Sequence, residues 1–209
     1  MNELNISQAL EMNFKKGEIL YTEKSIASGL FWIVSGTVKI YSTDKDSREV
    51  ILRLATNGDV IGHGFIFGNQ IHTDSAKVIE DTRCLFLKED DFQNLLQTNP
   101  GYALLLMKKF GKEIMWTQNR CIDLMRKNVR ERLACYFHYM AQNYGIEDSL
   151  GTKVKIQLSR EEIASMIGTA NETAIRFISE FKSMGLIQEE ERFFHILRPE
   201  ELATIGKIS

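Results

Sequence analysis

The chain has 209 residues, of which 44% are hydrophobic and 26% charged, and its formal net charge at pH 7 is −2. This composition is ordinary for a globular protein with a buried core and gives no sign of a polyanionic partner. Cys84, Cys121 and Cys135 lie far apart, which excludes a disulfide framework or zinc knuckle and favours a reducing compartment. No segment has the length and apolar character of a signal peptide or membrane span, so we expect a cytoplasmic protein without a membrane partner.

The first part of the chain, from Phe14 to about Leu87, has the pattern of a β domain. Turn signals such as Gly36, "TDKDS", "NGD" and "ED" separate short runs of β-branched and aromatic residues. Many short strands at this spacing predict a sandwich or a barrel-like roll. The predicted strands are "EILY", "LFWIV", "TVKIY", "EVILRL", "DVIGHGFIF", "SAKVI" and "TRCLFL".

Helices are predicted from Glu89 onward. A short helix should end at Asn99-Pro100, and a long helix should follow it. Apolar residues recur on the long helix at alternating steps of four and three, which is typical of the a/d seam of a two-stranded coiled coil. The seam residues are Ala103, Met107, Phe110, Ile114, Thr117, Cys121 and Leu124. Packing of the same stripe on the β domain of its own subunit is the alternative explanation.

A second helical block is predicted from about residue 128, beginning with a helix that Gly145 ends. "IEDSLGT" is expected to be a loop, and "KVKIQL" alternates like a short strand. Ser159 and Glu162 then fit a capping box, which starts another helix. The small residue Ala164 allows a second helix to cross closely, and Gly168 permits a sharp turn before it.

The second helix, at 170–184, has two different faces at about 100° per residue. Its apolar face carries Ala174, Phe177, Ile178 and Phe181. Its polar face carries Glu172, Arg176, Ser179 and Ser183, with Ile175 at the edge and Asn171 and Thr173 beside the N-terminal end.

A polar helix surface of this kind fits the major groove of DNA. Arg176 can donate two hydrogen bonds to guanine, Glu172 can accept one from cytosine, and Asn171 can pair with adenine or hold a phosphate. A Glu and an Arg four residues apart are also common on solvent-exposed helices, so the pair alone does not establish DNA binding. Two short strands, Leu186-Ile187 and Phe193–Leu197, follow the helix and predict the hairpin of a winged helix-turn-helix.

These motifs together resemble the cyclic-AMP receptor protein / fumarate-nitrate regulator (Crp/Fnr) family of bacterial transcription factors. The resemblance rests on "KKGEI", "IVSGTVKI", "GDVIG" and "LSREEIASMIGTANETAIRFISEFKSMGLI", and it covers about Phe14 to Leu197. It implies an α+β chain with a cyclic-nucleotide-binding-type β-roll at 1–99, a long dimerisation helix at 100–127 and a winged helix-turn-helix at 128–209. It also implies a homodimer on a palindromic DNA site with half-sites about one helical turn apart, and RNA polymerase as a partner.

By the same resemblance, Glu172 and Arg176 fall on the family's paired base-reading positions. Asn171 stands where an arginine is frequent, so one guanine contact is expected to be lost and a G·C pair in a "TGA"-like core to be kept. Ile175 would touch a thymine methyl group, and Thr173 with the helix N-terminus would bind phosphate. Ser159 and Arg160, at the start of the preceding helix, are also assigned to the DNA surface.

In the β-roll, this sequence departs from the residues with which the family binds a cyclic nucleotide. His63 stands where a ribose-binding glutamate is expected, and Asp74-Ser75 stands where an Arg-Ser pair would hold a cyclic phosphate. An aspartate repels a phosphate, so cyclic AMP is not expected, although Thr117 falls on the base-contacting position with Gln118 beside it. Another effector remains open, including haem on His63 or His72, and no cofactor or metal is predicted.

The charge distribution does not favour a basic DNA surface. Residues 128–209 carry ten Lys and Arg against twelve Asp and Glu, a net of 10 − 12 = −2, and the wing tip is acidic. We therefore expect weak non-specific DNA binding. A β-roll enzyme would need a His-x-His motif that the roll lacks, so no catalytic residue is predicted, while an interaction module that does not bind DNA is the remaining alternative.

Overall fold

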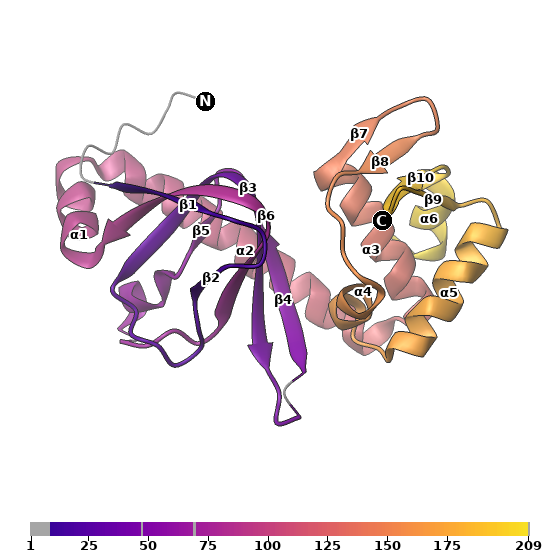
Figure 1. Cartoon of the computed structure of the whole chain (residues 1–209), viewed down its shortest axis with the longest axis horizontal. Helices are drawn as coiled ribbons and strands as arrows, with labels where there is room; N and C mark the ends of the chain where they lie inside the picture. Colours follow the sequence, from indigo (N-terminus) through magenta and orange to yellow (C-terminus); the bar gives the residue numbers. More distant parts are fainter. Residues whose placement is uncertain (1–8, 47, 69, 209) are drawn as a thin grey trace. The chain divides into compact units, whose positions relative to one another are not determined.

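A computed structural model describes residues 9–46, 48–68 and 70–208. The chain forms two compact units that divide between Ile114 and Met115 (Figure 1). This division falls inside a long helix, so the helix contributes residues to both units.

The first unit is an antiparallel β-roll. Its strands are β1 (Leu10–Phe14), β2 (Ile19–Tyr21), β3 (Gly29–Thr43), β4 (Glu49–Ala55), β5 (Val60–Ile61) and β6 (Ser75–Lys88). Strands β1, β6, β3 and β4 lie in that order, while β2 pairs with β6 and β5 pairs with β3. A β-roll was predicted from the recurring apolar runs, and the described sheet confirms it.

Two predicted strand breaks are wrong, because β3 and β6 are each one long strand. Gly36 lies inside β3 with φ of 92°, where the register with β6 shifts. A Cβ at this position would collide with the carbonyl of Asp81, so the glycine allows a bulge with close backbone approach. The predicted strand "DVIGHGFIF" is also shorter than expected, because Gly62 turns the chain into a 3-10 helix at His63–Phe67.

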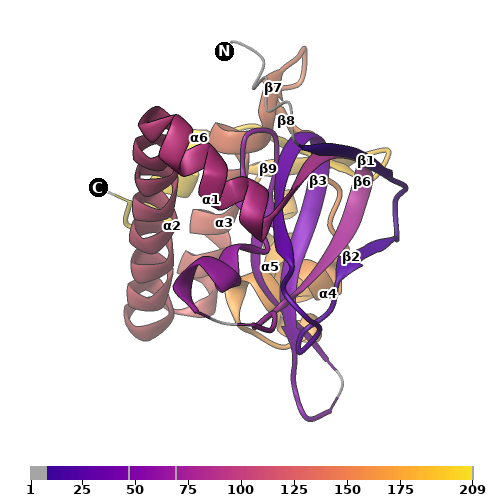
Figure 2. The same cartoon turned by 90° about the vertical axis from the view of Figure 1, so that its left-hand side faces the viewer.

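Alternation along β3 separates two hydrophobic clusters. Phe31, Ile33, Val38 and Ile40 point into the roll, where they are buried with Tyr21 and Cys84 among others. Leu30 and Trp32 point to the other face, where they pack against Phe92 of α1 (Glu89–Thr98) and Leu106 of α2 (Pro100–Arg126). The helix α1 and the first turns of α2 therefore cover one side of the roll (Figure 2).

The helix α2 exposes a continuous apolar face. Leu104, Met107, Ile114, Met115 and Met125 expose 55%, 69%, 57%, 64% and 85% of their surface. At about 100° per residue they lie on one side of the helix. Of the predicted seam residues, Phe110 packs against the core of its own roll, as the alternative explanation has it. Met107, Ile114, Thr117, Cys121 and Leu124 are exposed, and the exposed face extends to Leu104 and Met115.

The second unit contains the C-terminal part of α2, four further helices and a small sheet. Its elements are α3 (Val129–Tyr144), β7 (Gly145–Glu147), β8 (Thr152–Val154), α4 (Arg160–Ile167), α5 (Asn171–Ser183), β9 (Ile187–Glu190), β10 (Phe193–Ile196) and α6 (Pro199–Ile205). The four strands are ordered β7-β8-β10-β9. The helix pair and the hairpin behind it confirm the predicted winged helix-turn-helix. Two expectations are wrong: β7 and β8 take up the two ends of the "IEDSLGT" loop, and the strand in "KVKIQL" ends at Val154.

Within the described residues, no helix is long and apolar enough to span a membrane.

Candidate nucleic-acid interface

The start of α4 is fixed by the predicted capping box. The Glu162 backbone N–H donates to the Ser159 hydroxyl at 3.1 Å, and the Ser159 N–H donates to the Glu162 carboxylate at 2.9 Å. These two bonds satisfy donors that every helix N-terminus leaves open. Ile163, Ala164 and Ile167 are buried, so one face of this short helix is anchored in the core.

The turn between α4 and α5 is held by two arginines. Gly168 adopts the left-handed conformation, with φ of 65° and ψ of 53°. Arg132 donates to the carbonyl groups of Ile167 at 2.7 Å and Gly168 at 3.1 Å, and Arg120 donates to that of Met166 at 3.0 Å. These carbonyls lie at the negative end of the helix dipole, where positive charge is favourable.

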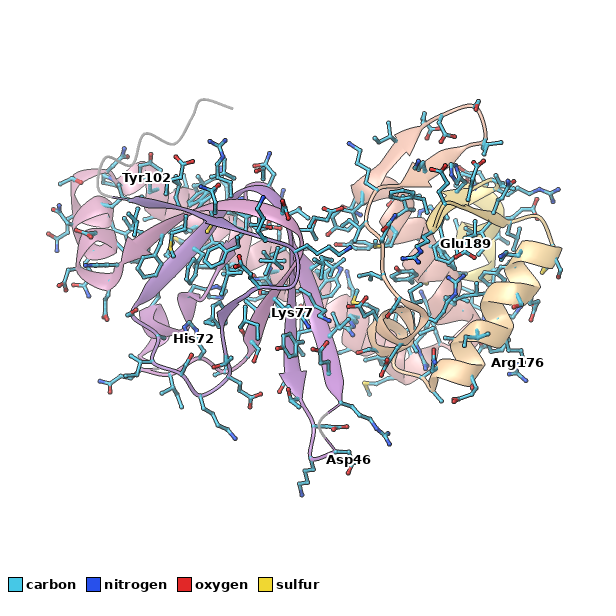
Figure 3. All side chains as sticks on the ribbon, in the orientation of Figure 1. Asp46, His72, Lys77, Tyr102, Arg176 and Glu189 are labelled. Carbon is cyan, nitrogen blue, oxygen red and sulfur yellow. The ribbon has the colours of Figure 1, made fainter. Side chains whose placement is uncertain are left out.

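Helix α5 presents the predicted polar face to solvent. Ala174, Ile178 and Phe181 are buried, whereas Glu172, Ile175, Arg176 and Ser179 are exposed. Arg176 points outward from α5 (Figure 3), and its guanidinium carbon lies 4.6 Å from the centre of the Phe177 ring. The stacking limits the directions in which the guanidinium can point, so Arg176 starts from a partly ordered position.

The N-terminus of α5 suits an anion. Its N-cap residue is Ala170, whose side chain cannot accept a hydrogen bond from the first backbone N–H groups of the helix. Thr173 is half-buried beside this end, and the buried Oδ1 of Asn171 has no hydrogen-bond partner among the described residues. The helix dipole and these N–H groups together favour a phosphate oxygen at this end.

An ion-pair network attaches α5 to its neighbours. Arg130 of α3 pairs with Glu180 of α5 at 2.6 Å. Glu189 of the wing (labelled in Figure 3) accepts from Arg160 at 2.5 Å and from Lys182 at 3.0 Å. Burial raises the pKa of Glu189, but the hydrogen bond from Lys182 and the charge of Arg160 outweigh it, so the pKa lies below its ordinary value. The network was not found from sequence, because its partners lie up to fifty residues apart.

The network also bears on two assignments made from sequence. Arg160 was assigned to the DNA surface, but the structure places its guanidinium on Glu189 and 4.6 Å from the centre of the Phe194 ring. The acidic wing is partly neutralised, because Glu189 contacts two cations. Glu190, Glu191 and Arg192 are exposed at the wing tip, where Glu191 and Arg192 have φ of 49° and 70°.

The residues assigned to an effector pocket contact other parts of their own unit. The hydroxyl of buried Tyr21 donates to Asp74 at 3.0 Å, and the hydroxyl of Ser75 accepts from the backbone N–H of Glu23 at 2.8 Å. The His63 ring centre lies 4.7 Å from that of Phe110. Burial lowers the pKa of His63 to about 4, assisted by the charge of Arg53 and opposed by that of Asp74.

Arg53, the last arginine before these residues in the sequence, also has a partner. Arg53 forms an ion pair with Glu113 of α2, with a nitrogen–oxygen distance of 2.7 Å. Thr117 and Gln118 are exposed on the part of α2 that belongs to the second unit. His72 stacks on Tyr21 with ring centres 3.9 Å apart, and burial lowers its pKa. In the part of the chain that the structure describes, no group of three or more His, Cys, Asp or Glu residues could hold a metal ion.

Two family models match this chain, one in each part. Residues 11–99 match the cyclic nucleotide-binding domain, and residues 131–205 match the Crp-like helix-turn-helix domain. The chain is 28% identical over 196 residues to the CRP-like cAMP-activated global transcriptional regulator of Mycobacterium tuberculosis, covering 94% of this chain and 88% of the relative. It is also 28% identical over 188 residues to electron transport regulator A of Shewanella oneidensis, covering 90% and 75%.

Solved structures show the same arrangement of elements. A CooA mutant from Carboxydothermus hydrogenoformans superposes with a TM-score of 0.81 at 26% identity, covering 96% of this chain and 89% of that one. FixK2 from Bradyrhizobium japonicum gives a TM-score of 0.83 at 22% identity, covering 96% and 98%, which supports the fold alone. The β-roll, long helix and helix-turn-helix thus occur here in the order of these regulators. The chain belongs to the Crp/Fnr family of transcriptional regulators and carries a Crp-like helix-turn-helix DNA-binding domain.

Proposed function

We propose that this regulator reads a two-fold symmetric DNA sequence as a homodimer, inserting α5 of each copy into the major groove. The observation that carries the proposal is the exposed set Glu172, Ile175, Arg176 and Ser179 on a helix whose opposite side is buried. A guanidinium can donate two bonds to guanine, and a carboxylate can accept one from cytosine. We therefore expect a G·C pair inside each half-site.

The proposal of a homodimer is supported by the exposed face of α2. Large apolar side chains are rarely exposed in such a continuous row unless another surface covers them. Met107, Ile114 and Met115 point away from the roll of their own chain. A second copy of the same helix would bury this row through a two-fold symmetric contact, as a palindromic DNA site requires.

We further propose that cyclic AMP does not control this protein, although the M. tuberculosis relative is named as cAMP-activated. Asp74 carries a charge of the wrong sign for a phosphate and already accepts a bond from Tyr21. Ser75 and Arg53, which a cyclic phosphate could otherwise use, contact Glu23 and Glu113. These residues do not fit a cyclic nucleotide.

Haem or another effector in the roll is not part of this proposal, since both candidate histidines lie against aromatic rings of the protein. His72, one of its two candidate ligands, is stacked on Tyr21. RNA polymerase is the further partner that we propose, because a transcriptional regulator bound to DNA acts on that enzyme.

Selection of bound sequences from random DNA by the purified, unliganded protein tests the proposal. We expect an inverted repeat with a G·C pair in each half and half-sites about 10 base pairs apart. Repeating the binding measurement with saturating cyclic AMP should leave the affinity unchanged. Affinity should weaken steeply with salt, because phosphate contacts release counterions.

A selection that returns no symmetric sequence, while the protein still binds DNA, would contradict the proposed reading mode. An increase in affinity with cyclic AMP would contradict only the proposal that cyclic AMP does not control the protein.

A further inference from the structure

The second unit contains a pocket that DNA reading does not use. It has a volume of about 430 Å³ and lies between the C-terminal half of α2, α3 and the end of α4. Small-molecule sites commonly have volumes of about 300–1,000 Å³ and mainly apolar walls. Here Trp116, Tyr136, Tyr139, Met166 and Ile167 provide such walls, and three of them are aromatic.

The charges around the pocket are unequal. Arg120, Lys127, Arg132 and Lys207 line it, against a single carboxylate, that of Asp123. Asp123 pairs with Lys127 at 2.9 Å, and Lys207 pairs at 2.5 Å with Glu131, which lies outside the lining. The positive charge that faces the pocket is therefore chiefly that of Arg120 and Arg132, which also donate to backbone carbonyl groups at the end of α4. Burial lowers the pKa of Arg120, which means that holding its charge here is unfavourable. A bound anion would relieve that cost, because opposite charges attract more strongly in a partly buried site.

Arg120 also connects the pocket to an aromatic surface. Its guanidinium carbon lies 5.5 Å from the centre of the Trp116 ring, and the same group donates to the Met166 carbonyl at 3.0 Å. A flat ring can stack on Trp116 or Tyr139, and an acidic substituent can reach the guanidinium at the same time. The combination selects a planar molecule that carries a negative charge.

We propose that this pocket is a binding site for a small planar aromatic anion and that its occupancy alters the geometry of the helix-turn-helix. The second part rests on the proposed DNA-reading function. Coupling is expected because Met166 and Ile167 line the pocket and end α4, immediately before the Gly168 turn. A ligand that presses on these residues or recruits Arg120 changes how the turn is held, and therefore how α5 is presented.

Anilinonaphthalene sulfonate, a fluorescent anion with a planar naphthalene ring, is a suitable probe. The chain has two tryptophans, and only Trp116 lines the pocket. We expect one probe per chain in the native protein, with energy transfer from Trp116. The transfer should disappear in Trp116→Phe and persist in Trp32→Phe. The neutral analogue phenylnaphthylamine should bind about tenfold more weakly, since it lacks the charge.

A matched pair of variants tests whether probe binding depends on the positive charge of Arg120. Arg120→Gln removes a cation from the pocket but keeps a side-chain donor, whereas Arg126→Gln removes an exposed cation of α2 that does not line it. We expect about tenfold weaker probe binding for the first variant and no change for the second. The proposed site would be contradicted if both variants changed probe affinity equally, or if the energy transfer came from Trp32 instead of Trp116.

If a second copy of the chain covers the pocket, the dimeric protein will not bind the probe, which also overturns the site. Probe binding is measured without DNA, so its failure is distinct from failure of DNA reading. Saturating probe should change the affinity for the selected DNA at least threefold. An unchanged affinity would overturn the coupling.

Discussion

Arg176 is the residue on which base reading most depends. It is exposed on α5, stacked on Phe177 and placed four residues after Glu172. Replacing it with alanine should weaken binding to the selected sequence by about 1–3 kcal/mol and relax the preference at one base pair. Fluorescence anisotropy with the selected site and with single-base variants of it measures both effects.

Arg192→Ala, at the exposed tip of the wing, is the matched control for that measurement. A cation that only neutralises phosphate affects all sequences about equally and lowers the salt dependence. If Arg176→Ala behaves in this uniform way, Arg176 holds phosphate and does not read a base.

His63 makes the stability of the β-roll depend on pH. Its pKa is lowered from about 6.5 to about 4 by burial, with Arg53 contributing and Asp74 opposing. The unfolded chain therefore binds more protons than the folded roll between these values, and stability rises with pH across the interval. The contribution of His63 to the free energy of unfolding is at its full value above about pH 6.5. It falls by up to about 3 kcal/mol as the pH is lowered to about 4.

Denaturant unfolding of a Trp116→Phe background measures this dependence, because Trp32 then reports on the roll alone. Adding His63→Gln should flatten the slope between pH 4 and 6.5, since glutamine does not titrate. His72 and the carboxylates are present in both proteins, so they do not account for the difference. Identical slopes would mean that His63 titrates normally.

At the scale of elements, the capping box determines where α4 begins. Ser159→Ala removes the acceptor of the Glu162 N–H and should destabilise the second unit by about 1 kcal/mol. Ser159→Asp restores an acceptor at the N-cap and should recover most of the loss. Thermal unfolding of the three proteins makes the comparison. If all three proteins have the same thermal stability, tertiary packing alone fixes the start of α4.

Elements with a strong local signal could be predicted from the sequence. The capping box, Gly168 and the apolar spacing of 174–181 locate the helix pair and the orientation of α5. Asn99-Pro100 locates the boundary between α1 and α2. The exposed positions Glu172 and Arg176 followed from helical periodicity alone, which is why this part of the candidate site was predicted from the sequence.

Features that depend on distant residues could not be predicted in the same way. Gly36 reads as a turn signal, yet here it permits a bulge against β6, whose pairing the sequence does not specify locally. Phe110 has the spacing of a coiled-coil seam, but the position of the roll core decides which side of α2 it faces. The ion pair between Arg160 and Glu189 joins residues 29 positions apart, so no local pattern in the sequence specifies it.

At the scale of the whole molecule, electrostatics and assembly act together. The chain has a net charge of −2, and several cations of the second unit are paired internally, as Arg130 is with Glu180. Few cations are left for phosphates, so one copy of α5 should bind DNA weakly. Two linked copies bind a double site far more tightly, because the second contact becomes intramolecular. Tight binding should therefore require the dimer.

Ile114→Glu tests that requirement at the centre of the exposed face of α2. Burying a carboxylate between two apolar helices is strongly unfavourable, so the variant should be monomeric where the wild type is dimeric, and its affinity for the palindrome should fall by at least about 100-fold. Sedimentation equilibrium measures the assembly and anisotropy the affinity. Lys112→Glu, an exposed charge reversal two residues away on another face, controls for the added acid. A monomeric Ile114→Glu variant that still binds the palindrome at full affinity would separate DNA reading from dimerisation. An undisturbed dimer would instead show that the exposed face of α2 is not the contact between copies.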